Sequence, residues 1–267
     1  MAARAQQRLN IRSVALPAEH GGWGFLIEPI LLGLLVAGSA GGVLLALAGV
    51  GVFLIHQPAK IAVKDRLKGN RTQRTAAAER FALGYGLLAV VPALILTLTM
   101  PITLWLPVVL AAPLGIVQLY YDSRNQSRRL VPELCGAGAL AMIAPAIAIL
   151  GGWFISTALV LWLVLVARAL TSILYVRARL RLEHGKPIPA QPVWMTHAAV
   201  LLGTVILAFT QTVPWLCVLA FVILWARAWL GLSAYRKPRP AKVIGFQEIA
   251  YGLITVILVA VGYRLFL

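Results

Sequence analysis

The chain has 267 residues, of which 61% are hydrophobic and 12% are charged, and its mean hydropathy is +0.88. This composition excludes an ordinary soluble domain, in which about half of the residues are apolar and about a quarter are charged. The formal net charge is +16, and in so apolar a chain it indicates basic cytoplasmic loops rather than nucleic-acid binding. We therefore expect a multi-pass protein of the cell membrane.

The first 16 residues are basic, with Arg4, Arg8 and Arg12, and they contain no separate apolar segment with a cleavage site. They are interpreted as a cytoplasmic tail rather than a signal peptide. Residues 17–267 are interpreted as one transmembrane domain. The two cysteines, Cys135 and Cys217, form no CxxC motif, and a disulfide or metal pair between them is not expected.

Helices that cross a bilayer need about 17–25 mostly apolar residues. The sequence predicts an all-α bundle of nine such helices. The predicted spans are residues 20–38, 41–60, 80–99, 102–121, 131–151, 153–176, 194–211, 214–234 and 245–265. Lys and Arg cluster after every even-numbered span, whereas the short connections after the odd-numbered spans contain none before Arg264. The positive-inside rule therefore places the N-terminus in the cytoplasm and the C-terminus outside.

Charged residues also occur inside three predicted spans. Glu28 lies about 12 Å into the first span, and Arg168 and Arg227 lie at a similar depth from the cytoplasmic ends of the sixth and eighth. Buried charges in a membrane usually face the bundle interior and have partners. We expect Glu28 to pair with Arg168 or Arg227 and to leave the other arginine for a polar or anionic ligand. The alternative is a purely structural ion-pair network.

The first span has one polar face. His20, Gly24 and Glu28 follow one another at intervals of four residues and share a side of the helix. Pro29 follows Glu28 directly, and a proline inside a helix removes one backbone hydrogen bond. His20 is interpreted either as a hydrogen-bonded structural residue or as a ligand contact.

Three other predicted cytoplasmic helix ends are polar, and their residues are the remaining candidates for a binding site. A basic rim that contacts anionic lipid is the alternative interpretation of many of these cations. The candidates for binding an anionic head group are His56, Gln57, Lys60, Lys64, Tyr120, Arg124, Arg168, Ser172, Tyr175, Arg179 and Arg227. The candidates for acid–base chemistry are Asp65, Asp122, Glu133 and Glu28.

Two family resemblances bear on these residues. The stretch LPAEHGGWGFLIEPILLGLL, residues 16–35, resembles the YwiC-like family of integral membrane proteins, with EHGGWG as its most specific part. The resemblance extends over most of the chain and implies no assigned activity. Nine helices with polar ends after spans two and six also resemble the UbiA superfamily of intramembrane prenyltransferases, which hold an isoprenyl diphosphate through Mg²⁺ and aspartate-rich motifs.

The aspartate motifs of the UbiA superfamily are degenerate in this chain. The first falls on Gln57, Pro58, Ile61 and Asp65, of which only Asp65 is acidic. The second falls near Ser172, Tyr175, Arg179 and Glu183, where Arg179 inverts the charge. Mg²⁺ is the cofactor that the resemblance implies, but it needs well-placed carboxylates, and most of the motif aspartates are absent. The basic residues in their place imply either binding of a lipid phosphate through Lys and Arg without a metal or a fold that has lost catalysis. No metal-ligand motif is found in the sequence.

Three functions remain open. The first is binding of an isoprenoid or another amphiphile with an anionic head, with divergent prenyl transfer as its enzymatic form. The second is a non-catalytic subunit or assembly factor of a membrane protein complex. The third is a transporter, in which Glu28 and the buried arginines mark the substrate path. Membrane lipid is a partner in each of these readings, and nucleic acid is not.

Overall fold

The computed structural model describes residues 11–16, 20–69 and 72–266 and contains no strand in these ranges. The all-α class expected from the sequence is confirmed. The elements are α1 (Ile11–Ala15), α2 (His20–Ala37), α3 (Ala40–Leu67), α4 (Gln73–Thr99), the 3₁₀ helix η1 (Ile102–Trp105), α5 (Leu106–Ser123), α6 (Leu130–Ala141), α7 (Ile143–Leu150), α8 (Ile155–Glu183), α9 (Gln191–Phe209), α10 (Trp215–Leu232) and α11 (Ala241–Phe266).

Every predicted span falls on one helix or on two consecutive helices. The fourth falls on η1 with α5, and the fifth falls on α6 with α7. The largest differences are at polar ends: α3 continues to Leu67, α4 begins at Gln73 and α8 continues to Glu183. Hydropathy detects the part of a helix that suits lipid, and it does not detect the polar turns that extend the same helix beyond the membrane.

The structure confirms a multi-pass membrane protein. Among the described residues, eight helical segments are long and apolar enough to cross a bilayer: α3, α4, η1 with α5, α6 with α7, α8, α9, α10 and α11. The described apolar part of α2, Gly22–Ala37, is shorter. The ninth crossing and the orientation of the termini therefore stay predictions. The helix α2 runs without a break through Pro29.

The chain groups into two compact units. Unit 1 comprises Met1–Gly22 and Leu44–Met100, and unit 2 comprises Trp23–Val43 and Pro101–Leu267. Unit 1 thus contains α1, α4 and most of α3, and unit 2 contains most of α2 and all elements from η1 onward. That residues 17–267 form one domain stays a prediction.

Unit 1 is built around the α3–α4 hairpin. The two helices pack closely where Gly51 faces the backbone of Ala89, since a Cβ at Gly51 would lie within 2.8 Å of the Ala89 Cα. Thr72 caps α4, because its side chain accepts a hydrogen bond from the backbone N–H of Thr75. The short helix α1 lies within the segment expected to be a tail, and it buries Val14 in a cluster with residues of α3 and α4.

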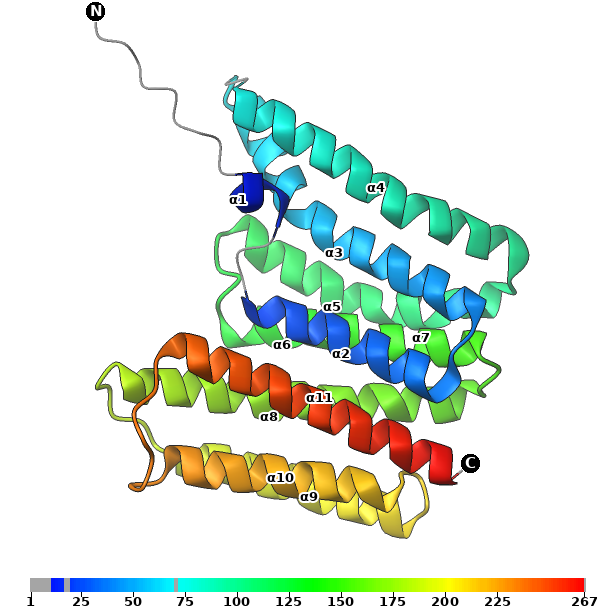
Figure 1. Ribbon diagram of the computed structural model, residues 1–267. Helices are drawn as coiled ribbons and strands as arrows, with labels where there is room; N and C mark the ends of the chain where they lie inside the picture. The colour runs from blue at the N-terminus through cyan, green and yellow to red at the C-terminus, as the bar shows by residue number, and fades with distance from the viewer. Residues whose placement is uncertain (1–10, 17–19, 70–71, 267) are drawn as a thin grey trace, which may run out of the picture. The chain divides into compact units, whose positions relative to one another are not determined.

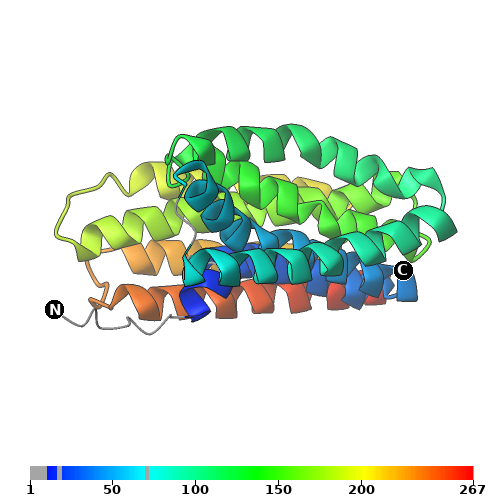
Figure 2. The ribbon, with the colours of Figure 1, turned by 90° about the horizontal axis from the view of Figure 1, so that it is seen from above.

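In unit 2, the long helix α8 packs against α6, α7, α9, α10 and α11. Figures 1 and 2 show α8, α9, α10 and α11 running beside one another. Their shared core contains Leu161, Leu165, Phe221, Leu224 and Val259. Apolar helices exclude water here, so any charged side chain that points inward requires a partner within the helical group.

Candidate functional site

The interior of unit 2 contains a buried ion pair between α2 and α8. Arg168 Nη2 donates hydrogen bonds to Glu28 Oε1 at 3.2 Å and to the Glu248 backbone carbonyl at 3.0 Å. The side chains of Arg168 and Glu28 are only 2% and 8% exposed. Of the two pairings that the sequence leaves open for Glu28, the structure shows the one with Arg168.

The second buried arginine, Arg227, also has an acidic partner, and its predicted contact with a ligand stays a prediction. Arg227 Nη1 donates to both carboxylate oxygens of Glu248, at 2.6 and 2.7 Å. Arg227 Nη2 lies 3.5 Å from His197 Nε2, and His197 Nδ1 lies 2.8 Å from the Val193 carbonyl. Because a carbonyl oxygen only accepts, Nδ1 of His197 carries the proton and Nε2 is the acceptor for Arg227.

Glu248 joins the two ion pairs. Its Oε2 accepts a hydrogen bond from Ser172 Oγ and lies 3.8 Å from Arg168 Nη1. We call Glu28, Arg168, Arg227 and Glu248 the interior network. Its two positive and two negative charges cancel, which suits a region without water, since an unpaired charge there is costly.

Two tyrosine rings enclose the guanidinium of Arg227. The Cζ atom of Arg227 lies 4.2 Å from the ring centroid of Tyr175 and 5.3 Å from that of Tyr251. Such cation–π contacts strengthen when the groups are desolvated. Arg227 is therefore held by a carboxylate, two rings and a histidine, and its Nε has no hydrogen-bond partner among the described residues.

The local sequence explains how α8 and α11 supply this site. Arg168, Ser172, Tyr175 and Arg179 follow at intervals of three and four residues, and all four are buried, which confirms their predicted common face. On α11, Gly252 lies one turn after Glu248. A Cβ at Gly252 would overlap the Glu28 carboxylate and lie 3.1 Å from Arg168 Nη2. Glycine at this position therefore lets Glu28 reach Arg168.

Arg179 contacts two backbone carbonyls and one acid. Its Nη1 and Nη2 donate to the carbonyls of Gly231 and Lys237, and Nη2 lies 2.8 Å from Glu183 Oε1. Only 3% of Arg179 is exposed. Arg179 therefore joins the end of α8 to the connection between α10 and α11 through hydrogen bonds.

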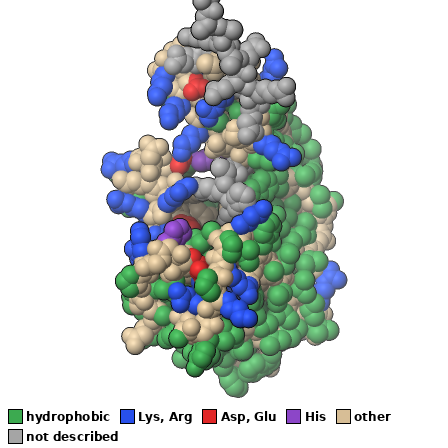
Figure 3. All heavy atoms as spheres, turned by 60° about the vertical axis from the view of Figure 1, so that its left-hand side comes forward, with side chains coloured by type: hydrophobic (Ala, Val, Ile, Leu, Met, Phe, Trp, Pro, Cys, Tyr) green, Lys and Arg blue, Asp and Glu red, His purple; other side chains and the backbone are tan. Residues whose placement is uncertain are grey.

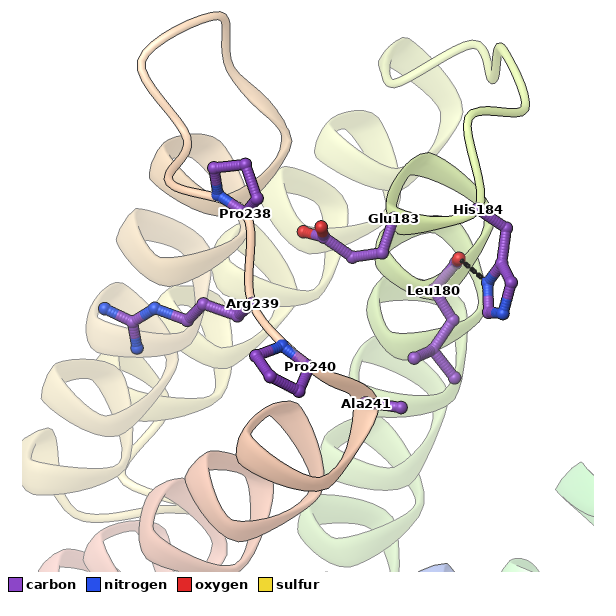
Figure 4. Close-up of a pocket in the computed structure, with 7 residues that line it drawn as sticks. All are labelled: Leu180, Glu183, His184, Pro238, Arg239, Pro240 and Ala241. Carbon is purple, nitrogen blue, oxygen red and sulfur yellow. Dashed lines mark hydrogen bonds between the residues drawn. The ribbon is translucent and has the colours of Figure 1, made fainter.

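A pocket of about 330 Å³ lies where Arg179 makes these contacts. It is open to the surface and is lined by Leu180, Glu183, His184, Pro238, Arg239, Pro240 and Ala241. Figure 4 shows Glu183 pointing from α8 toward the segment that carries Pro238 and Arg239, whereas the Arg239 guanidinium points away from α8. His184 Nδ1 lies 2.6 Å from the Leu180 carbonyl.

Arg239 lines this pocket, and further cationic residues lie close in sequence to its lining residues. We call them the basic end of unit 2; they are Arg181, Lys186, Arg236, Lys237, Arg239 and Lys242. Of these, only Arg236 is partly buried, and its Nε has no hydrogen-bond partner in the described part of the chain. Figure 3 shows Lys and Arg side chains gathered beside a hydrophobic flank.

The other predicted residues of unit 2 lie around the α5–α6 connection. The ring of Tyr120 lies 4.5 Å from the Arg124 Cζ atom, and both residues are exposed. Asp122 is in the last turn of α5, and its backbone carbonyl accepts from Asn125. Glu133 pairs with Arg177 of α8 at 2.8 Å. None of these contacts joins the interior network.

Five predicted residues belong to α3 of unit 1. His56, Lys60 and Lys64 are exposed, and Gln57 is partly buried. Asp65 accepts a hydrogen bond from Thr75 Oγ1 at 2.9 Å across the α3–α4 turn, which gives it a structural contact. His20 is the first residue of α2, and its side chain lies outside the described residues.

Glu248 and His197 are site residues that the sequence does not predict. The predicted last span begins at residue 245, which places Glu248 at its border. The helix α11 begins at Ala241, so Glu248 lies about two turns inside it. The depth of an acid in its helix identifies Glu28 from the sequence. The same criterion identifies Glu248 once the helix is known to begin at Ala241.

The described residues do not form a magnesium site of the aspartate-rich kind. They contain no group of three His, Cys, Asp or Glu side chains that could hold a metal ion. Glu183 is occupied by Arg179, and Asp65 accepts from Thr75.

The comparison with known families identifies the first half of the chain. The family model described as YwiC-like protein matches residues 16–148. This chain belongs to the YwiC-like family. The matched segment is shorter than the likeness expected from the sequence, and it ends within α7.

The match covers the interior network only in part. Of its four residues, Glu28 lies inside residues 16–148, whereas Arg168, Arg227 and Glu248 follow it. No curated protein and no solved structure matches this YwiC-like chain. Its function is therefore argued from its own residues.

Proposed function

We propose that this YwiC-like membrane protein binds an isoprenoid or another amphiphile with an anionic head at the basic end of unit 2. The observation that supports this proposal is the open pocket at the end of α8, with the exposed cations around it. Lys and Arg bind phosphate through charge-assisted hydrogen bonds without a metal. The apolar flanks of the neighbouring helices suit the tail of such a molecule.

The arginines that we assign to the head group differ from those expected from the sequence. Arg168, Arg179 and Arg227 are buried and bound to carboxylates or carbonyls. An anionic head that bound them would have to displace those partners. Arg239 is exposed and has no acid partner among the described residues, and its guanidinium points away from α8 (Figure 4). We therefore assign the head group to the outer side of the segment Pro238–Ala241, at Arg239 and its neighbours.

Divergent prenyl transfer is the finer form of this proposal. It would require Mg²⁺ or a cationic substitute at the diphosphate. Because the described acids form no metal site, binding is expected to depend on Lys and Arg, and chelation of Mg²⁺ with EDTA is expected to leave it unchanged.

Native mass spectrometry of the purified protein in a neutral detergent tests the proposal. Farnesyl diphosphate is compared with farnesol, which has the same tail without the charge, each with MgCl₂ and with EDTA. Farnesyl diphosphate is expected to bind and farnesol to bind at least about tenfold more weakly, since a hydrogen bond to a charged group contributes about 1.5–3 kcal/mol. Equal binding of the two would overturn the proposal.

Two charge-reversal variants locate the site. Arg239→Glu at the basic end is expected to weaken the binding of farnesyl diphosphate by about tenfold or more. Arg264→Glu changes the net charge equally near the other end of α11 and is expected to leave binding unchanged. If both variants weaken binding equally, the positive charge of the whole protein attracts the ligand and the pocket does not.

A further inference from the structure

The two arginines of the interior network differ in the number and strength of their contacts. Arg227 makes two short bonds to Glu248 and lies against two rings. Arg168 is 1% exposed, and it makes both of its hydrogen bonds through Nη2 alone. Its Nε and Nη1 have no hydrogen-bond partner among the described residues, whereas Arg227 lacks one only at Nε. Nη1 of Arg168 lies 3.8 Å from Glu248 Oε2, beyond hydrogen-bond distance. Buried guanidinium donors without acceptors are costly, so Arg168 has spare capacity for an acceptor.

Glu28 is the more weakly held of the two acids. In the described residues, its carboxylate accepts one hydrogen bond, from Arg168 at 3.2 Å. Glu248 accepts from Arg227 twice and from Ser172. Protonation of Glu28 therefore disrupts fewer hydrogen bonds and ion pairs than protonation of Glu248 would. Beside Glu28, a Cβ at Gly24 would lie 3.7 Å from Oε1, which is ordinary van der Waals contact, so the carboxylate is not crowded on this side.

The net charge of the interior network connects the unpartnered donors of Arg168 with the weakly held carboxylate of Glu28. With both acids ionised, the network is neutral, and an added anion would leave a net negative charge in an apolar interior. When Glu28 is protonated, Arg168, Arg227 and Glu248 together carry one positive charge. The groups that face Glu28 or complete the network are Arg168 from α8, Arg227 from α10, Glu248 from α11 and, through Arg227, His197 from α9. One anion then restores neutrality.

We propose that Arg168 and Glu28 form an interior site that binds one small anion together with one proton. The anion accepts hydrogen bonds from the free N–H groups of Arg168, and the proton occupies the Glu28 carboxylate. Arg227 and Glu248 stay paired and fix the charge of the surroundings. This site is separate from the pocket at the basic end and does not depend on the function proposed there.

Calorimetric titration with sodium nitrate tests the coupling directly. The full-length protein in a neutral detergent is titrated at pH 6.5 in two buffers that differ in ionisation enthalpy, against sodium gluconate at equal ionic strength. The difference in heat between buffers gives the number of protons taken up per nitrate. Uptake of up to one proton is expected in the wild type. Nitrate binding without proton uptake, or no binding, would overturn the proposal.

The variant Glu28→Gln separates the proton from the anion. The neutral amide resembles the protonated acid, so this variant is expected to bind nitrate with no proton uptake and equally at pH 5 and pH 8. In the wild type, nitrate binding is expected to weaken by about tenfold or more between these pH values, as linkage to one proton requires. Nitrate binding that responds to pH in the same way in Glu28→Gln and in the wild type would overturn the proposal.

Further variants distinguish the site from adventitious binding to exposed cations. Arg168→Lys keeps the charge but removes the planar fork of donors, and it is expected to weaken nitrate binding. The control Glu133→Gln removes an acid from the partly exposed pair with Arg177 and is expected to bind as the wild type does. Equal binding in Arg168→Lys and the wild type would overturn the proposal.

Discussion

At the scale of single residues, unit 2 keeps its interior charges in pairs. Arg227 is the most constrained, since its partner Glu248 holds it through two hydrogen bonds and its exposed side-chain fraction is 4%. Removing one partner of such a pair leaves the other charge buried without compensation. The cost then includes the desolvation of that charge as well as the lost contact.

The variant Arg227→Ala is therefore expected to lose about 3–5 kcal/mol of stability. The matched control is Arg177→Ala, which breaks the pair with Glu133, where the side chains are 41% and 36% exposed. Its loss is expected to be at most about 1 kcal/mol. Thermal unfolding of both variants in the same detergent measures the difference. Equal losses would show that the interior pair is solvated.

A second prediction concerns Thr75 of unit 1, which is fully buried. Its hydroxyl donates to Asp65 and accepts from the backbone N–H of Thr72. Thr75→Val keeps the shape and removes both bonds, so a loss of about 1–3 kcal/mol is expected. In the control Thr97→Val, an exposed hydroxyl bonded to Ala93 is removed, and a change within about 0.5 kcal/mol is expected. Hydrogen exchange at the α3–α4 turn reports the effect, and protection unchanged in Thr75→Val would contradict it.

At the scale of elements, close packing of helices places the charges. Glycines on α10 and α11 face side chains of the site: a Cβ at Gly231 would lie within 2.9 Å of the Tyr175 ring, and a Cβ at Gly252 would overlap the Glu28 carboxylate. By contrast, Gly245 on α11 has nothing within 4 Å of an added Cβ. The same substitution on one helix should therefore have opposite effects at two positions.

Gly252→Ala is expected to destabilise the protein by about 1–3 kcal/mol through overpacking. Gly245→Ala is expected to be neutral or to stabilise it by up to about 1 kcal/mol, because alanine loses less backbone freedom in a helix. The two unfolding midpoints are compared in one detergent. If Gly252→Ala is as stable as Gly245→Ala, Glu28 does not approach α11 as the structure shows.

Much of this arrangement is visible in the sequence, because lipid imposes a simple requirement. A span must be apolar, so Glu28 and Arg168 stand out by depth alone, and their pairing follows from the cost of an isolated charge. The depth of a residue in the sequence does not show which of two candidates completes a pair. The acidic partner of Arg227 is missed because the predicted span places Glu248 at a helix border. The contacts of Arg179 could not be predicted, since they depend on the path of an irregular connection, Ser233–Pro240, over the end of α8.

At the scale of the whole molecule, the charges are sorted by sign and by depth. The net charge of +16 lies almost entirely in segments predicted to be cytoplasmic, whereas the interior network of unit 2 is neutral. The odd number of predicted spans places the two termini on opposite sides of the membrane. This orientation would put the basic end of unit 2 in the cytoplasm, where anionic lipids and soluble phosphates are available.

Reporter fusions test the orientation. Alkaline phosphatase, which is active only outside the cytoplasm, is expected to be active at the C-terminus and inactive when inserted after Lys237. Green fluorescent protein is expected to fluoresce in the cytoplasm after Lys237 and not at the C-terminus. Activity of the phosphatase at both sites or at neither would mean that α11 does not cross the membrane. Activity after Lys237 and not at the C-terminus would mean that the predicted orientation is reversed.

Binding of an anionic head group at the basic end of unit 2 can be mapped onto the chain itself. The probe is a farnesyl diphosphate analogue that carries a photoreactive group near its head, and peptide mapping locates its crosslinks. We expect the crosslinks on the end of α8 and on the segment Pro238–Ala241, and we expect unlabelled farnesyl diphosphate to compete for them. Crosslinks confined to the opposite helix ends, around residues 210–214, would contradict this binding site.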